Sequence, residues 1–256
     1  MNSLRGKTAV ITGGSRGIGL AIAQHFARLG ASTILVGRDN VTLRAAVESV
    51  QKQPVYTIQT PSATDSPSAP SLATSNIGPS PPSSTPAQQK QSIDILVNCA
   101  GVSQGSLLKS TSLEDIDKIL DTNLKSAVLG CKYIGAHMMR RSGPSIINVS
   151  SVMAMRGGVG AAVYAATKAG LLGLTSSLSV ELGQFGIRVN ALVPGYIDTS
   201  MIQNFSRDAL TRHIPLKRTG LVSEVADAAA FLAQNTYANN CVLTLDGGLT
   251  ASMLSG

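Results

Sequence analysis

Two residues whose side chains could transfer a proton, Tyr164 and Lys168, stand four positions apart in the sequence YAATK. This run opens a predicted helix, and residues four apart lie on the same face of a helix. A phenol has a pKa of about 10 and transfers its proton poorly at neutral pH, but a neighbouring cation lowers that pKa by favouring the phenolate. We therefore expect Tyr164 to act as a general acid toward a carbonyl oxygen, with Lys168 lowering its pKa.

Other polar side chains follow predicted strands. Ser150 and Ser151 end a strand just before that helix, and the carboxyl ends of parallel strands line the ligand crevice of such sheets. Either hydroxyl could hydrogen-bond the carbonyl of a substrate. Asn123 lies inside another predicted helix, where asparagine is a mediocre helix former, so we expect a purpose for it such as holding water. Further residues at strand ends are predicted to contact a cofactor: Asn98, Ala100, Gly101, Pro194, Gly195 and Thr199.

A glycine-rich turn with the sequence TGGSRGIG lies at 12–19, between the first predicted strand and the first predicted helix. Its spaced glycines lack Cβ atoms, which lets the backbone approach the pyrophosphate of a dinucleotide. The helix that begins here offers free N–H groups and the positive end of its dipole. We predict a dinucleotide site, with a tight turn that binds no ligand as the alternative. The predicted contacts are Gly13, Ser15, Arg16, Gly17, Ile18 and Gly19.

The end of the second predicted strand bears on the choice between NAD and NADP. An acidic residue there would bind the free ribose diol of NAD, but Gly37 occupies that position and Arg38 follows it. Arg16 lies in the glycine-rich turn, and two guanidinium groups suit a 2′-phosphate. The sequence therefore favours NADPH. Asp39 stands one residue later and would serve NAD if the register of the strand were shifted by one.

These residues are positioned by strands and helices that alternate along the whole chain. Such alternation predicts a doubly wound parallel sheet of the Rossmann type, an α/β fold in one domain over residues 1–256. The predicted strands cover 7–12, 32–37, 55–59, 93–98, 145–150, 187–193 and 241–245, and the predicted helices cover 17–29, 41–51, 113–141, 162–184 and 223–233.

One stretch, 60–92, breaks this alternation. It is dominated by Ser, Pro, Thr and Ala and holds seven of the eleven prolines, which excludes a continuous helix. It also lacks the large apolar residues that folding alone would need. We predict a flexible surface loop in the place of an expected helix.

Composition narrows the classes of function. The net charge of +7 is spread along the chain, which favours an anionic cofactor or an acidic protein partner over nucleic acid. The three cysteines match no zinc spacing, so no metal site is expected. No apolar run reaches the roughly 18 residues of a membrane span, and the first strand follows the N-terminus too closely for a signal peptide. We expect an intracellular protein of the cytoplasm or the mitochondrial matrix.

Several motifs occur in the order found in one enzyme family: TGGSRGIG at 12–19, NCAG at 98–101, Asn123 in DTNLKS, Ser151, the pair Tyr164 and Lys168, and Pro194-Gly195. With these the chain resembles the short-chain dehydrogenase/reductase family. The resemblance implies that Tyr164 is the catalytic acid, that Lys168 lowers its pKa and holds the nicotinamide ribose, and that Ser151 orients the carbonyl. It assigns a water relay to Asn123, the adenosine half of the cofactor to Asn98, Ala100 and Gly101, and the carboxamide to Ile197, Thr199 and the backbone after Pro194.

Within this family the chain is most similar to the 3-oxoacyl-[acyl-carrier-protein] reductases, through runs such as PGYIDTSM, IPLKRTG and DGG. That similarity implies NADPH-dependent reduction of a 3-oxoacyl thioester in fatty acid synthesis, a carrier-protein contact at Arg140 and Arg141, and a homotetramer formed through the two long helices. Phe185 stands at a second position that is basic in those reductases.

Two alternatives remain open from the sequence. Phe185 favours a carbonyl reductase that acts on a small ketone, a quinone or a secondary metabolite. The region 62–65, where the family has an acidic adenine contact, lies in the Ser/Pro-rich loop and favours a nucleotide-binding subunit without turnover.

Overall fold

The computed structural model describes residues 3–50, 54–60, 92–139, 141 and 143–252. Within these residues, seven parallel strands form one sheet in the order β3-β2-β1-β4-β5-β6-β7. Nearly all of the loop predicted over 60–92, the region 62–65 and Arg140 lie outside the described residues. The strands are β1 (Thr8–Thr12), β2 (Ser32–Gly37), β3 (Val55–Gln59), β4 (Ile95–Asn98), β5 (Ser145–Val149), β6 (Arg188–Pro194) and β7 (Val242–Leu245).

The predicted α/β fold of the Rossmann type is confirmed. Every residue of β4, β5 and β6 is buried, because helices cover both faces of the sheet, and this explains why these strands are continuous apolar runs in the sequence. The strand order reverses direction between β1 and β4, where ligands bind in open α/β sheets. The register pairs Thr12 with both Val36 and Asn98, so the turns that follow these strands emerge side by side.

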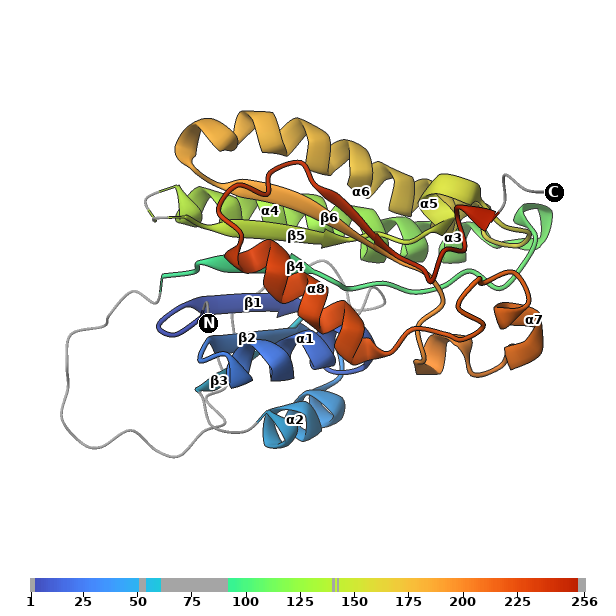
Figure 1. Ribbon diagram of the computed structural model, residues 1–256, viewed down its shortest axis with the longest axis horizontal. Coiled ribbons are helices and arrows are strands. Elements are labelled where there is room, and N and C mark those ends of the chain that lie inside the picture. Colours follow the sequence, from blue (N-terminus) through green and yellow to red (C-terminus); the bar gives the residue numbers. More distant parts are fainter. Residues whose placement is uncertain (1–2, 51–53, 61–91, 140, 142, 253–256) are drawn as a thin grey trace.

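Helices pack on both faces of the sheet (Figure 1). One face carries α1 (Gly17–Arg28), α2 (Asn40–Ser49) and α8 (Val222–Gln234), which enclose an apolar core around Phe26. The other face carries α4 (Ser126–Met138) and α6 (Ala162–Glu181), which enclose a second core around Met138. A smaller apolar cluster with Val152 and Val193 lies at the carboxyl edge of the sheet.

The continuous helix predicted over 113–141 is wrong in detail. It consists of α3 (Leu113–Leu120), a π-helical segment η2 (Asp121–Lys125) and α4. The sequence does not show this change of winding because apolar periodicity averages over several turns. Segments of three to five residues were missed for the same reason: η1 (Leu108–Ser110), α5 (Met153–Arg156), η3 (Gly183–Phe185), η4 (Ser200–Ile202) and α7 (Arg207–Thr211).

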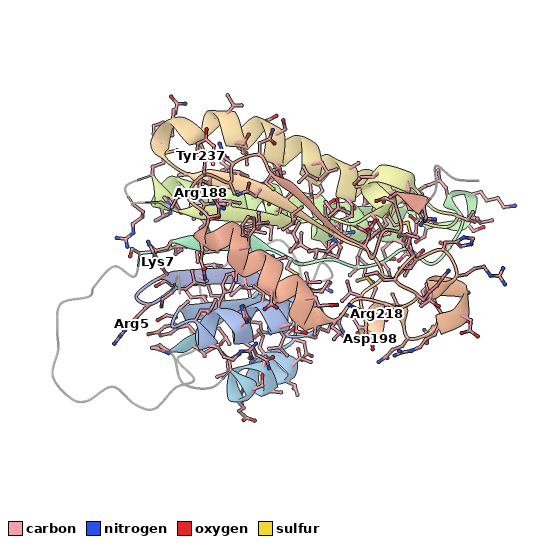
Figure 2. All side chains as sticks on the ribbon, viewed as in Figure 1. Arg5, Lys7, Arg188, Asp198, Arg218 and Tyr237 are labelled. Atoms are coloured by element: carbon pink, nitrogen blue, oxygen red, sulfur yellow. The ribbon has the colours of Figure 1, made fainter. Side chains whose placement is uncertain are left out.

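A buried carboxylate joins three segments at the amino edge of the sheet. Asp94 has a side chain only 2% exposed, accepts the backbone N–H of Thr8 at 2.9 Å, and pairs with Arg141 at 3.0 Å and Lys7 at 3.4 Å. Figure 2 shows Lys7 at this end of the molecule, whereas Asp198 lies at the opposite end. Asp94 therefore links the start of β1 to the segment between α4 and β5.

We expect Asp94→Ala to lower the free energy of unfolding by about 2–3 kcal/mol, because it removes the shared acceptor of one buried N–H and two cations. Urea unfolding followed by circular dichroism measures this change. Asp121→Ala is the control, since Asp121 pairs with Lys125 at 3.0 Å on the exposed surface and should contribute at most about 0.5 kcal/mol. Equal effects of the two substitutions would contradict the prediction.

Candidate active site

The turns after β1 and β4 are in direct contact at the carboxyl edge of the sheet. Thr12 Oγ1 accepts the backbone N–H groups of Cys99 at 3.0 Å and Ala100 at 3.1 Å. A Cβ on Gly13, whose φ is +67°, would lie 2.9 Å from the Cα of Ala100. A side chain at position 13 would therefore separate the two turns, which explains the glycine. Thr12 was not singled out from the sequence, although it begins the motif.

The N-terminus of α1 faces the same edge. Arg16 is its N-cap residue, has extended backbone and makes no side-chain capping bond, so the first N–H groups of the helix are free of a side-chain cap. A Cβ on Gly17 would lie 3.6 Å from Cγ2 of Thr199, which places the segment after β6 beside this turn. The structure thus brings together predicted contacts from three strand ends. Ser15 is half-buried, and Ile18 packs against the core beneath.

The structure ends β2 at the residue that the sequence suggested, so Gly37 occupies the last strand position and Arg38 follows it. Gly37 pairs with Gln59, and Arg38 is an exposed residue. Asp39 is the N-cap of α2, and its carboxylate accepts the N–H of Thr42 at 2.7 Å. The hydrogen bonds from Thr42 lower the pKa of Asp39, and the charge of Arg16 acts in the same direction. The carboxylate of Asp39 is thus engaged in capping α2.

Arg16 and Arg38 lie at neighbouring positions of this edge. Thr12 of β1 pairs with Val36 of β2. Arg16 follows Thr12 by four residues, and Arg38 follows Val36 by two. Both side chains are exposed, and neither guanidinium group is hydrogen-bonded or ion-paired to a described residue. Two such cations next to a helix N-terminus suit a phosphate group.

The predicted catalytic residues converge on the ends of β5 and α6. The side chain of Ser151 lies close enough to the hydroxyl of Tyr164 to oppose the rise that burial causes in the pKa of that phenol, and Ser151 Oγ accepts the N–H of Met153 at 3.2 Å. Ser150 has another role, because its hydroxyl donates to the backbone carbonyl of Lys168 at 2.7 Å. The structure therefore selects Ser151, rather than Ser150, as the hydroxyl beside Tyr164.

Lys168 is buried one helical turn from Tyr164. Its Nζ donates to the carbonyl of Val149 at 2.9 Å and lies 5.7 Å from the centre of the Tyr164 ring. A Cβ on Gly101 would lie 3.4 Å from Nζ, so the turn after β4 reaches this lysine. Burial lowers the pKa of Lys168 to about 8, although the neighbouring Cys99 acts in the opposite direction.

The expected lowering of the Tyr164 pKa is wrong for this structure. Burial raises the pKa of Tyr164, and the neighbouring side chain of Ser151 opposes this only in part. The reason is that desolvation penalises the phenolate, an effect that spacing along a helix does not reveal. A raised pKa keeps the phenol protonated at neutral pH, as a proton donor requires.

The lowered pKa of Lys168 predicts a pH dependence. We expect kcat/KM for carbonyl reduction to be constant below pH 8 and to fall above it, because the ammonium group loses its proton as the pH rises through about 8. Lys168→Arg keeps its charge in this range, so whatever activity it retains should show no such decline. A wild-type profile that is flat up to about pH 9.5 would contradict the prediction.

The side chain of Asn123 clamps a loop. It lies in the π-helical segment η2, accepts the N–H of Val102 at 2.8 Å and donates to the carbonyl of the same residue at 3.0 Å. It also donates to Thr167 at 3.2 Å. The buried amide of Asn123 therefore holds other parts of the protein in place. The water relay that the resemblance assigns to it stays a proposal.

Asn98 has its side chain inside the molecule. Its amide donates to Asn148 at 2.9 Å and to Cys131 at 3.3 Å beneath α4. Only the backbone of Asn98, next to Ala100 and Gly101, remains for the predicted cofactor contact. A sequence pattern does not distinguish these two uses of a strand-end asparagine.

The segment after β6 closes the carboxyl edge. The carbonyl of Pro194 accepts the N–H of Val152 at 3.0 Å, and Gly195 donates to Leu245 of β7 at 2.8 Å. Ile197 is bridged to Gly220, and the hydroxyl of Thr199 donates to the carbonyl of Ile197 at 3.2 Å. The predicted residues of this segment therefore lie between the end of β5 and the glycine-rich turn.

Residues 7–210 match the family model described as short chain dehydrogenase. The chain belongs to the short-chain dehydrogenase/reductase family. It is 34% identical over 252 residues to the 3-oxoacyl-[acyl-carrier-protein] reductase FabG of Chlamydia trachomatis, with 95% of this chain and 97% of that protein covered. It is 32% identical to carbonyl reductase family member 4 of Xenopus tropicalis, with 96% and 99% covered.

A solved protein of similar structure is a blue fluorescent protein from a metagenomic library in complex with NADPH. Its TM-score is 0.82 at 31% identity, with 97% of this chain and 99% of that chain covered. The chain is thus a short-chain dehydrogenase/reductase enzyme. This finding counts against the alternative of a nucleotide-binding subunit without turnover. Within the described part of this short-chain dehydrogenase/reductase, none of the helices combines the length and the apolar character that a bilayer crossing requires.

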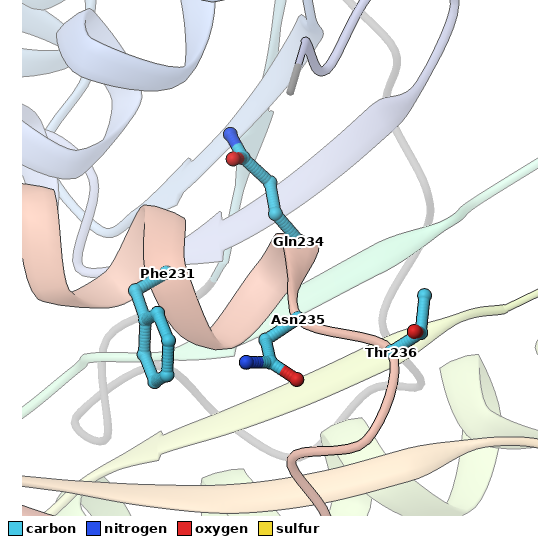
Figure 3. Close-up of a pocket in the computed structure, with 4 residues that line it drawn as sticks. All are labelled: Phe231, Gln234, Asn235 and Thr236. Atoms are coloured by element: carbon cyan, nitrogen blue, oxygen red, sulfur yellow. The ribbon is translucent and has the colours of Figure 1, made fainter. Parts of the chain in front are cut away.

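Two hollows of this short-chain dehydrogenase/reductase lie away from the site, at the amino edge of the sheet. One, of about 380 Å³, is lined by Phe231, Gln234, Asn235 and Thr236 at the end of α8 (Figure 3). The other, of about 500 Å³, includes Arg188 in its lining. Arg188 donates to the last carbonyls of α8, at 2.8 Å from that of Leu232. The described residues that line these hollows include no acid–base pair, and we assign the hollows no chemistry.

Proposed function

We propose that this enzyme reduces a ketone to a secondary alcohol with NADPH, and that its substrate is a 3-oxoacyl thioester of fatty acid synthesis. The observation that carries the reaction type is the placement of the Ser151 side chain beside Tyr164, with buried Lys168 one turn along α6 and its Nζ 5.7 Å from the centre of the Tyr164 ring. Arg16 and Arg38 support NADPH over NADH. The substrate class is supported by the full-length similarity to 3-oxoacyl-[acyl-carrier-protein] reductases.

The residues present fit a dinucleotide. Gly13 and Gly17 are both at positive φ, which glycine adopts without steric cost, and the N-terminus of α1 that follows this turn has no side-chain cap. The N-terminus of α1 would bind the pyrophosphate, Arg16 and Arg38 the 2′-phosphate, and Lys168 the nicotinamide ribose. The reduced cofactor supplies the hydride. The remaining proposed contacts are Ser15, Ile18, Gly19, the backbone of Asn98, Ala100, Gly101, Pro194, Gly195, Ile197 and Thr199.

The protein's own part of the reaction is binding and proton transfer. The hydroxyls of Ser151 and Tyr164 would bind the carbonyl oxygen of the substrate, and Tyr164 would donate its proton to that oxygen as the alcohol forms. The ammonium group of Lys168 would stabilise the resulting phenolate. Asn123 would hold a water relay that returns a proton to Tyr164, in addition to holding the loop at Val102.

A homotetramer formed through the long helices is part of the proposal. Val128, Leu129 and Tyr133 of α4 and Val180 of α6 are exposed apolar or aromatic side chains on these helices. Burial of such residues between subunits is favourable. Light scattering after size-exclusion chromatography tests the tetramer.

The second candidate is reduction of a free ketone or quinone. Arg141 is bound to Asp94 at the amino edge, and Phe185 stands at the end of α6. Among the described residues, the ion pair of Arg141 with Asp94 and the apolar side chain at position 185 reduce the cationic character of this surface, and one full-length relative is named a carbonyl reductase. This candidate shares the catalytic residues and the cofactor.

A substrate comparison separates the two. NADPH oxidation is measured with acetoacetyl and longer 3-oxoacyl thioesters, on coenzyme A and on acyl carrier protein, beside a panel of free ketones and quinones. We expect the highest kcat/KM with the thioesters. Turnover of the ketones alone would support the second candidate, and no turnover of any carbonyl would contradict both.

A further inference from the structure

The helix that carries Tyr164 and Lys168 has no cap of its own. α6 begins at Ala162, and the preceding Ala161 has a methyl side chain that accepts no hydrogen bond. The first N–H groups of a helix need outside acceptors, and an N-cap side chain normally bonds the second or third of them. In α6 those groups belong to Val163 and Tyr164.

Gln104, which precedes them by 59 and 60 residues, supplies the missing acceptor. Its Oε1 accepts the N–H of Val163 at 2.8 Å and the N–H of Tyr164 at 3.2 Å. Its Nε2 donates to the carbonyl of Ser106 at 3.0 Å and to the hydroxyl of Thr111 at 3.2 Å. The reversed amide would face two N–H donors with its own NH₂ group, so these four partners fix its orientation.

The contact reaches the catalytic residue directly. The backbone N–H of Tyr164 donates to Gln104, and the side chain of Ser151 lies beside the hydroxyl of Tyr164. The loop that carries Gln104 is itself held, because Asn123 clamps Val102 on both its N–H and its carbonyl. The first turn of α6 is thus tied to the loop that leaves the proposed cofactor turn at 98–101.

We propose that Gln104 is a positioning residue for the catalytic acid: by capping the first turn of α6, it holds the hydroxyl of Tyr164 at the position where the carbonyl oxygen of the substrate is bound. This inference rests on the proposed role of Tyr164 as the proton donor. Proton transfer depends steeply on the distance between the two oxygens, so a small shift of the first turn reduces kcat more than substrate binding.

The test compares Gln104→Ala with Gln104→Glu. Gln104→Ala removes the acceptor, and we expect kcat to fall about 10- to 100-fold while the Kd for NADPH changes less than about threefold. Gln104→Glu keeps an acceptor oxygen for the two N–H groups but loses the NH₂ donor to the carbonyl of Ser106, so kcat should recover in part and stay above that of the alanine variant. Its negative charge also raises the pKa of Tyr164 and Lys168, so the alkaline decline of kcat/KM should move to higher pH.

Gln184→Ala and Gln184→Glu are matched controls at the other end of the same helix, where Gln184 donates to the carbonyl of Glu181 at 2.9 Å. They should leave kcat and the pH profile unchanged. Hydrogen exchange of the Val163 and Tyr164 amides reports the cap without a substrate and should accelerate in Gln104→Ala alone. Wild-type kcat in Gln104→Ala would overturn the inference, as would a Gln104→Glu variant no better than alanine. A wild-type enzyme that reduces no carbonyl would instead overturn the proposed function.

Discussion

Tyr164→Phe should lower kcat for carbonyl reduction by a factor of about 10³ or more, which is within the range that a positioned general acid contributes. The substitution removes only the phenol oxygen, so the ring keeps its place near Lys168 Nζ, which lies 5.7 Å from the ring centre. The hydroxyl of Ser151 then remains as the one donor of the pair, and it is a far weaker acid than the phenol. Affinity for NADPH should stay within about threefold of the wild type.

Single-turnover absorbance of NADPH measures the chemical step, and fluorescence titration measures cofactor binding. Tyr237→Phe is the matched control, because Tyr237 is 97% exposed and lies at the amino end of the sheet (Figure 2). It should leave both quantities unchanged. A Tyr164→Phe enzyme that retains wild-type kcat would refute the assignment of Tyr164 as the acid.

Arg38→Asp should reverse the preference between cofactors. We expect the Kd for NADPH to rise about 100-fold, because a charge-assisted hydrogen bond contributes about 1.5–3 kcal/mol and the new carboxylate repels the 2′-phosphate. The same carboxylate follows the end of β2, where it could accept the ribose hydroxyls of NADH, so the Kd for NADH should fall. Arg16 remains and limits the loss.

Titration of the wild type and of Arg38→Asp with NADPH and with NADH measures this change. All titrations use one ionic strength, because charge interactions weaken with salt. Arg44→Asp is the control, because Arg44 is an exposed residue of the neighbouring helix α2 and its reversal changes the net charge equally. It should alter NADPH binding by less than about threefold. A similar loss in both variants would assign the effect to overall charge rather than to a contact of Arg38.

The elements that could be predicted are those whose signal is local. The strands are apolar runs and the helices α1 and α8 have apolar periodicity, so their types and approximate bounds follow from neighbouring residues. The π-helical segment around Asn123 could not be predicted, because its winding depends on contacts with Val102 and Thr167 from other parts of the chain. Short helices such as α5 span too few residues to show a period.

The candidate site divides in the same way. Spacing along one helix determined the pairing of Tyr164 with Lys168, and the glycine pattern determined the position of the turn at 12–19. Whether Ser150 or Ser151 faces Tyr164 was open, since both follow the same strand. The carbonyl of Lys168, which binds the hydroxyl of Ser150, decides it. The register around Asp39 was open as well, and the structure ends β2 at Gly37 and places Asp39 at the N-cap of α2, where its carboxylate accepts the N–H of Thr42.

The sequence by itself thus determined the order of strands and helices, the family resemblance and the choice of Tyr164 as the proposed acid, because each depends on residues that are close together in the chain. Only the tertiary structure decided the direction of the Tyr164 pKa and the cap on its helix. The first depends on how many atoms from distant segments displace water around the phenol. The second depends on Gln104, whose acceptor oxygen meets the N–H of Tyr164 only after the sheet has brought β4 beside β5.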